Sequence, residues 1–164
     1  MTITLRTPQS TDYLAIASWF DNTTDVRRWA GPTMPYPFAA SELEALLQKP
    51  ELALESFCLV DDTGTLCGFG QFWRPLAAAG MPAVIDNSVH LGRIVIAPGQ
   101  RGRGYGRLLM ELLIAKAIEV TAASALTLRV YRSNLVAATL YSQLGFVALD
   151  QLSNDELLFM ALIR

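Results

Sequence analysis

The residues best suited to chemistry lie in the stretch GQRGRGYGRLL, residues 99–109. Positions 101–107 hold three glycines and three arginines, between the apolar run RIVIA and an apolar pattern with helical spacing. A glycine-rich turn from a strand into a helix lets several backbone N–H groups converge at the positive end of the helix dipole. Arginines add charge-assisted hydrogen bonds and favour a ligand with more than one phosphate. The stretch therefore predicts a cradle for a small phosphorylated ligand.

Two familiar phosphate motifs are excluded by their spacing. A dinucleotide fingerprint, G-x-G-x-x-G, would need a third glycine where this chain has Arg107, after Gly102 and Gly104. A P-loop would end in Gly-Lys-Ser/Thr, and that ending is missing here. On this stretch alone, an ordinary surface turn with solvated arginines is the alternative interpretation.

Composition narrows the class of protein. A chain of 164 residues, 52% hydrophobic, predicts a single domain over residues 1–164 with a sizeable core. The formal net charge of −2 argues against nucleic acid as a partner. No apolar run approaches the ~18 residues of a membrane span, and the segment MTITLRTPQSTDY lacks the apolar core of a secretion signal. We therefore expect a cytoplasmic protein without a membrane partner.

The two cysteines predict neither a disulfide framework nor a metal site. Cys58 and Cys67 lack the CxxC spacing of zinc and redox motifs. They are expected to be buried, reduced residues on the two arms of a hairpin.

The first half of the chain predicts a strand at TITLR and a helix at DYLAIASWF, capped by Thr11 or Asp12. The segment RRWAGPTMPYPF, rich in proline and aromatic residues, predicts a loop. A short helix follows at SELEALLQ, with Ser41 as its cap and Glu44 completing a capping box. SFCLV and LCGFGQFW flank the polar insert DDTGT and predict an antiparallel hairpin, followed by a loop over residues 75–87.

The second half predicts a central strand, two helices and a terminal strand pair. VHLGRIVIAP is nearly apolar on both faces, as in a strand covered by helices, and Pro98 ends it. A helix is expected over residues 104–122, a strand at ALTLRVY and a helix in NLVAATLYSQL that stops at Gly145. FVALD and LLFMALI complete the set as strands. The expected inward-facing residues of the two helices are Leu108, Leu109, Leu112 and Leu113, then Ala137, Leu140, Tyr141 and Leu144.

Two of these segments resemble a known family. Arg101, Gly104 and Gly106 match the R/Q-x-x-G-x-G/A signature that follows the fourth strand in the GCN5-related N-acetyltransferase superfamily. LRVYRSNLVAATLYSQLGF resembles the next motif of that superfamily, at the right distance, so the resemblance is specific over residues 88–147. It implies an α/β (α+β) fold with a mixed, mostly antiparallel sheet of about seven strands flanked by about four helices.

The resemblance also implies a function. Acetyl-CoA would be the co-substrate, and an acetyl group would move to a primary amine of a small molecule or of a peptide N-terminus. Dimers are common in that superfamily, so the resemblance allows a homodimer. A non-catalytic module that binds CoA or another diphosphate ligand is the alternative, and transfer of a longer acyl group or to a hydroxyl is a third hypothesis.

Site residues follow from the resemblance position by position. The backbone along Ile94, Val95 and Ile96 would bind the pantetheine arm, and Asn134 would contact the cofactor. Tyr141 would lie near the thioester sulfur as the general acid. Asn134 also suits a helix N-cap, and Tyr141 a core position. The diphosphate would be bound by the loop residues Arg101, Gly102, Arg103, Gly104, Tyr105, Gly106 and Arg107.

The sequence leaves more than one candidate for the general base and for the acceptor of the acetyl group. Several relatives place a glutamate on or near the fourth strand, but SVHLGRIVI contains no carboxylate. His90, the single histidine, has a suitable ordinary pKa of ~6.5 and is the candidate, with a structural role or a water chain as alternatives. Arg93 resembles the residue that some relatives of that superfamily have at this position. No acidic cluster points to a polyamine. Aromatic residues in segments that border the acceptor cleft in this fold are compatible with an apolar acceptor or with simple packing: Trp19, Trp29, Tyr36, Phe38 and Trp73.

Overall fold

One sheet organises the computed structural model, which describes residues 1–48, 53–75 and 85–164. Its seven described strands lie in the order β1-β2-β3-β4-β5-β7-β6. The predicted loop over residues 75–87 lies largely outside the described residues. The strands are β1 Thr4–Arg6, β2 Leu54–Val60, β3 Leu66–Trp73, β4 Ser88–Ile96, β5 Ala125–Tyr131, β6 Val147–Ala148 and β7 Leu157–Ile163.

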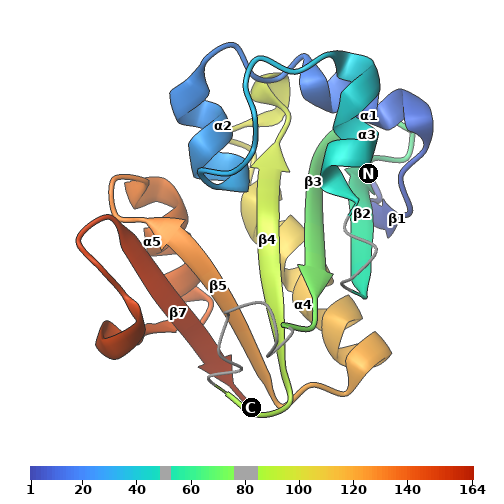
Figure 1. Ribbon diagram of the computed structural model, residues 1–164. Helices are drawn as coiled ribbons and strands as arrows, with labels where there is room; N and C mark the ends of the chain where they lie inside the picture. The colour runs from blue at the N-terminus through green and yellow to red at the C-terminus, as the bar shows by residue number, and fades with distance from the viewer. Residues whose placement is uncertain (49–52, 76–84) are drawn as a thin grey trace.

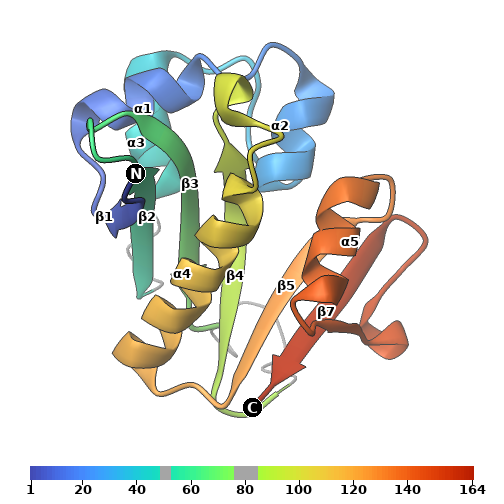
Figure 2. The same ribbon diagram turned by 180° about the vertical axis from the view of Figure 1, so that it is seen from behind.

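Helices cover both faces of this sheet. α4 and α5 lie on one face, and α1, α2 and α3 gather on the other face at the end where β4 finishes (Figures 1 and 2). The expected fold, mixed and mostly antiparallel, is confirmed, and the described residues form one α-helix more than the four expected. No helix in the described parts of the chain has the length and apolar character that a bilayer crossing needs. The α-helices are α1 Ser10–Ala17, α2 Thr23–Ala30, α3 Ala40–Leu47, α4 Tyr105–Thr121 and α5 Leu135–Gln143.

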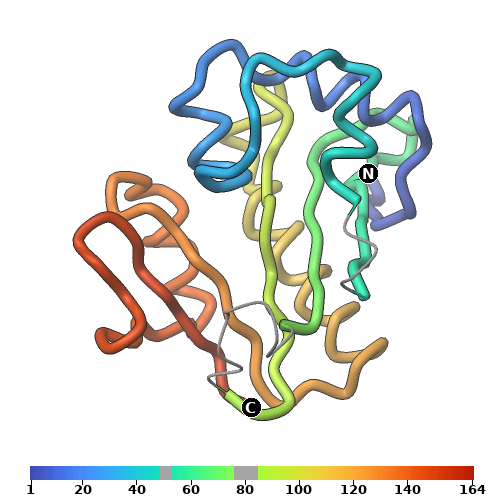
Figure 3. Tube along the Cα trace, viewed as in Figure 1, coloured from blue at the N-terminus to red at the C-terminus, as the bar shows by residue number. Residues whose placement is uncertain are grey.

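β4 and β5 form the parallel pair of an otherwise antiparallel sheet, and they soon separate. Their register holds for three residue pairs, from Ser88 opposite Ala125 to His90 opposite Thr127. Beyond His90 the two strands run apart toward the end of β4 (Figure 3). Among the described residues, the edge of β4 that faces β5 is therefore left without a strand partner from Leu91 to Ile96.

A bulge bends β4 inside this separated part. Phe69 of β3 pairs with Val95 and Gln71 pairs with Gly92, so one residue of β3 opposes two of β4. Arg93, in the bulge, has a left-handed φ of 53°, which is uncommon for a residue with a side chain. Trp29 of α2 donates a hydrogen bond from Nε1 to the Arg93 carbonyl oxygen at 2.8 Å. The bulge is thus held in place by a helix that lies beside it.

α4 packs on the sheet largely as its apolar spacing predicts. Leu109 and Leu113 are fully buried, together with Met110 and Ala117. Leu108 and Leu112 are only half-buried, although they were expected to face the core. β5, α5 and the terminal β6–β7 pair match their predictions, and Gly145 takes a φ of +100° after α5.

The N-terminal half departs from its prediction at α2. The segment expected to be a loop contributes Arg27–Ala30 to this helix, which begins after Asn22. The Asn22 side chain accepts a hydrogen bond from the Asp25 N–H at 2.8 Å, which caps the helix. Val26 and Trp29 are buried one turn apart, so tertiary packing stabilises a helix in a segment whose prolines predicted irregular backbone.

The caps of α1 and α3 also differ from the prediction. Asp12 accepts a hydrogen bond from the Gln9 N–H at 2.7 Å, so Gln9 is the first cap position and Asp12 lies one turn inside. In α3, Glu42 accepts from the Ala39 N–H at 3.0 Å, in place of the predicted Ser41 and Glu44. The carboxylates do cap these helix starts, and the cap positions lie two or three residues before the predicted ones. The predicted β2–β3 hairpin is confirmed, with Cys58 and Cys67 buried and free on its arms.

Gly92 is required where the Trp73 ring crosses β4. A Cβ added at Gly92 would lie 2.5 Å from Cη2 of Trp73. We expect Gly92→Ala to lower the free energy of unfolding by about 1–3 kcal/mol, measured by urea denaturation, because the ring must move. Gly99→Ala is the control, since its Cβ would meet no atom within 4 Å. Equal stability of the two variants would show that the Trp73 contact is not constraining.

Candidate active site

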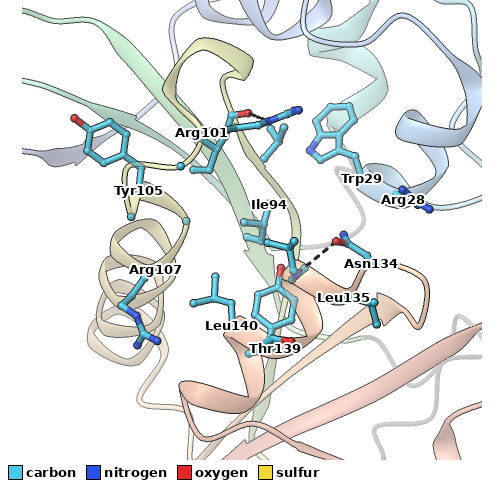
Figure 4. Close-up of a pocket in the computed structure, with 18 of the residues that line it drawn as sticks. Arg28, Trp29, Ile94, Arg101, Tyr105, Arg107, Asn134, Leu135, Thr139 and Leu140 are labelled. Atoms are coloured by element: carbon cyan, nitrogen blue, oxygen red, sulfur yellow. Dashed lines mark hydrogen bonds between the residues drawn. The ribbon is translucent and has the colours of Figure 1, made fainter.

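A cleft of about 1030 Å³ opens between the unpaired edge of β4, the start of α4 and α5, with α2 as its fourth wall. Figure 4 shows Ile94 of β4 between Arg107 of α4 and Asn134 beside α5, with Trp29 of α2 above. All of the predicted site residues except His90 and Arg103 line it. These are Ile94, Val95, Ile96, Arg101, Gly102, Gly104, Tyr105, Gly106, Arg107, Asn134 and Tyr141.

The turn before α4 supplies backbone donors at one end of the cleft. Gly102 and Gly104 have φ values of +76° and +80°, a conformation that favours glycine. A Cβ added at either glycine would meet no atom within 4 Å, so both face open space. Gly104 is the N-cap of α4 and has no side-chain hydrogen bond to the first turn. The N–H groups of Tyr105, Gly106 and Arg107 therefore lack an intrahelical acceptor and suit a bound anion.

The arginines of the turn differ in position. Arg101 donates from Nε to the Ile96 carbonyl oxygen at 3.3 Å. Arg107 donates from Nη2 to Oε1 of Gln143 at 2.7 Å and lies 3.7 Å from the Glu111 carboxylate. Both side chains border the cleft, but Arg103 does not line it. The sequence placed all three together because spacing in a turn does not show which way a side chain points.

Tyr141 is buried in the wall of the cleft. Its side chain is 8% exposed, and its ring meets the Phe146 ring edge to face, with 6.2 Å between the ring centroids. Burial raises the pKa of Tyr141 to about 12. The phenol oxygen has no hydrogen bond to a described residue, and it is not fully buried. It is therefore open to the cleft that Tyr141 lines. A phenol held protonated beside a cleft can donate its proton to a departing group.

Asn134 caps α5 at the edge of the cleft. Its side-chain oxygen accepts from the Ala137 N–H at 3.4 Å, which caps α5. The residue also lines the cleft. Within the described chain, its side-chain NH₂ group has no hydrogen-bond acceptor and remains available to a ligand.

The structure does not bring His90 to the cleft. Its ring is 6% exposed, and Nδ1 lies 2.8 Å from Oγ1 of Thr127 in the paired part of β4 and β5. Burial, with a smaller contribution from the Arg129 charge, lowers the pKa of His90 to about 3. An imidazole that lies away from the cleft and is protonated only near pH 3 is a poor general base at neutral pH. The geometry therefore supports the alternative of a structural role for His90.

Sequence reasoning missed the wall contributed by α2. Phe20, Asp25, Arg28 and Trp29 border the cleft from this side. Arg28 also donates from Nη2 to Oγ of Ser133 at 3.3 Å, which links α2 to the turn between β5 and α5. Trp29 was expected near an acceptor cleft, but not as the hydrogen-bond donor to β4. The spacing of Val26 and Trp29 was the signal that could have indicated a helix here.

The missed part of the α5 wall is apolar and exposed. Leu135 and Val136 are 72% and 84% exposed, although both are large hydrophobic residues. They follow Asn134 directly and line the mouth of the cleft. In the described parts of the chain, no group of three or more His, Cys, Asp or Glu residues is placed to hold a metal ion.

Comparison with known proteins points to one family. The model of the family described as "Acetyltransferase (GNAT) family" matches residues 23–146. A curated relative from Bacillus subtilis (strain 168), the uncharacterized N-acetyltransferase YobR, is 34% identical over 76 residues. That alignment covers 46% of this chain and 30% of the relative, so this chain spans about a third of that protein.

Solved structures share the fold along nearly the whole chain. Spermidine N-acetyltransferase from Vibrio cholerae, in complex with CoA and spermine, superposes with a TM-score of 0.76 at 22% identity. This match covers 98% of the present chain and 95% of the other. A dodecameric structure of the Vibrio cholerae enzyme in an intermediate state gives a TM-score of 0.69 at 21% identity, covering 98% and 93%. At these identities the likeness concerns the fold.

The buried, neutral His90 predicts a pH-dependent stability. Because the unfolded chain protonates this histidine below about pH 6.5 and the folded state does not, the unfolded state binds more protons and stability falls as pH drops from 6.5 toward 3. At pH 5 the loss from this group is about 2 kcal/mol. We expect His90→Gln to remove this part of the slope in urea denaturation at pH 7.5 and pH 5. Parallel slopes for the two proteins would contradict a buried neutral imidazole.

Proposed function

Because the chain belongs to the acetyltransferase (GNAT) family, we propose that it transfers an acetyl group from acetyl-CoA to a primary amine. The observation that carries this proposal is the cleft at the parting of β4 and β5, which ends at a glycine turn with free backbone N–H groups. The transferred group and the acceptor would meet where β4 presents an unpaired edge.

The residues of the cleft fit CoA. The open space at Gly102 and Gly104 and the N–H groups at the start of α4 suit a diphosphate, with Arg101 and Arg107 beside them. The unpaired edge at Ile94–Ile96 offers main-chain partners to the amides of the pantetheine arm. Asn134 and the exposed Leu135 and Val136 would contact the rest of the molecule. Arg103 takes part only through its backbone, because its side chain lies outside the cleft.

Acetyl-CoA supplies the acetyl group on a thioester, and its sulfur is the leaving group. Main-chain N–H groups of the Ile94–Ile96 edge would hydrogen-bond to the thioester oxygen as negative charge develops there. Tyr141 would donate its phenolic proton to the sulfur as the carbon–sulfur bond breaks. Burial raises the pKa of Tyr141, so the phenol carries its proton at physiological pH.

Water is the proposed acceptor of the amine proton. His90 is buried away from the cleft and neutral. Asp25 is the carboxylate that lines the described cleft, and it lies on the exposed side of α2, where it accepts a hydrogen bond from Nδ2 of Asn22 at 2.9 Å. A water chain to the open mouth of the cleft therefore replaces a side-chain base.

Location and assembly remain predictions. We place the enzyme in the cytoplasm, since the buried cysteines Cys58 and Cys67 are free thiols, as expected in a reducing compartment. The homodimer that the resemblance allows can be checked by light scattering of the purified protein.

Gly104→Glu tests the phosphate cradle. The carboxylate would enter the space at the start of α4 and repel a diphosphate, so we expect at least 100-fold weaker binding of CoA by isothermal titration. Gly64→Glu is the matched control: its φ is +84°, a Cβ there also meets no atom within 4 Å, and it lies in the β2–β3 turn. Equal CoA affinity in the two variants would refute the cradle.

Tyr141→Phe tests the general acid. We expect kcat to fall by about 100-fold or more while the dissociation constant of acetyl-CoA changes little, because only the proton donor is lost. Tyr131→Phe on β5 provides the control for the loss of a phenol. A parallel loss of kcat and of acetyl-CoA affinity would assign Tyr141 to packing. Turnover of acetyl-CoA with any amine would also exclude the alternative of a non-catalytic CoA-binding module.

A further inference from the structure

The guanidinium of Arg93 is only partly used by the protein. Its side chain lies on the sheet face that carries α3, where Nη1 donates to Oε1 of Gln71 at 2.8 Å and to the Leu47 carbonyl oxygen at 3.4 Å. Both acceptors are neutral. The other edge of the guanidinium, formed by Nε and Nη2, makes no hydrogen bond to any described residue. This edge has the two parallel donors that match a carboxylate.

No described carboxylate balances this charge. The ion pairs of the described chain join other residues, and none includes Arg93. Burial lowers the pKa of Arg93, and no acid of the described residues opposes the shift. Arginine nevertheless stays protonated in proteins, so a half-buried cation is left without a counter-charge. Removing a cation from water is costly unless an anion pairs with it.

The surrounding sheet surface adds a second cation and a row of rings. The Arg93 guanidinium carbon lies 5.8 Å from the Trp73 ring centre. The Trp73 ring is followed by His90 at 5.1 Å and then by Phe159 at 6.1 Å from His90. The exposed Arg129 lies over Phe159 at 5.6 Å. This sheet face carries a cation at each end and uncharged rings between them, of which His90 and Phe159 are buried.

Arg93 also adjoins the point of transfer. It directly precedes Ile94–Ile96, the β4 edge that lines the cleft. Its carbonyl oxygen is bonded to Trp29, which lines the same cleft from α2. A group bound to the free guanidinium edge would therefore lie beside the opening between β4 and β5, on the face opposite α4.

We propose that the acceptor is a primary amine that also carries a carboxylate, such as a free amino acid, and that Arg93 binds this carboxylate through Nε and Nη2. The proposal rests on the proposed acetyl transfer to an amine, and it narrows the acceptor class. A polyamine would bring further positive charge toward Arg93 and Arg129. The Vibrio cholerae enzyme crystallised with spermine shares the fold, but at 22% identity its substrate does not transfer to this chain.

Matched acceptors provide the test. Acetyl transfer is measured for phenylalanine, phenylalaninamide and phenethylamine, for the corresponding leucine set, and for spermidine. The amide lacks the charge, and its peptide-like α-amino group, with a pKa of about 8, holds more of the neutral nucleophile at neutral pH. Chemical reactivity therefore favours the amide. We expect the carboxylate member to have the highest kcat/KM in spite of this, and spermidine the lowest.

Arg93→Gln and Arg93→Lys identify the binding group. We expect Arg93→Gln to lower kcat/KM for the amino acid by about 10- to 100-fold, bringing the ratio of amino acid to amide close to one. Arg93→Lys keeps the charge but loses the paired donors, so it should give an intermediate ratio. Lys116→Gln, at an exposed ion pair on α4, is the control and should keep the wild-type ratio. CoA binding by titration verifies that each variant is folded.

The outcomes separate this inference from the proposed function. Transfer to spermidine or to uncharged amines in preference to amino acids overturns the inference and leaves the acetyltransferase in place. A ratio unchanged in Arg93→Gln overturns it as well. If no amine is acetylated, the proposed function fails, and titration of the CoA-saturated protein with phenylalanine and phenethylamine decides the inference alone. Binding that needs both the carboxylate and Arg93 upholds Arg93 as the carboxylate-binding group, and equal binding of the two ligands overturns that assignment.

Discussion

The parting of β4 from β5 is the constraint on which the cleft depends. Three residue pairs join the strands, and the bulge at Arg93 then lets β4 follow β3 while β5 runs away from it. Continued pairing would satisfy the β4 edge with sheet hydrogen bonds and close the opening. The left-handed φ that Arg93 adopts in the bulge costs conformational free energy. The hydrogen bond from Trp29 to the Arg93 carbonyl oxygen offsets this cost.

α2 ties the two sides of the opening together. A helix of eight residues has little stability of its own, so its position depends on the buried Val26 and Trp29. Through Trp29 it contacts the bulge of β4, and through Arg28 it reaches Ser133 at the turn before α5. The same short helix therefore holds the strand that lines the cleft and forms the wall across from α4.

Burial acts on three ionisable groups of β4 and α5, with different consequences. Desolvation keeps His90 neutral and Tyr141 protonated, because each can adopt its uncharged form at little cost. Arg93 cannot do so, since the guanidinium holds its proton at any physiological pH. The first two groups become a structural residue and a proposed proton donor. The third remains a charge that the described protein leaves unpaired, which is why it is the basis for the proposed acceptor class.

Local patterns in the sequence determined much of the fold and one end of the site. The apolar run of β4, the hairpin around DDTGT and the helical spacing after Gly104 each depend on neighbouring residues, and each was predicted correctly. The glycine turn and its resemblance to a family signature likewise need only residues close in the chain. By contrast, α2 lies in a segment whose prolines indicated a loop, and burial of Val26 and Trp29 decided for a helix. The orientation of Arg103 away from the cleft, the burial of His90 and the free edge of Arg93 were decided by the tertiary structure alone. Spacing along the chain specifies backbone geometry, whereas the surroundings of a side chain are set by strands and helices that are distant in sequence.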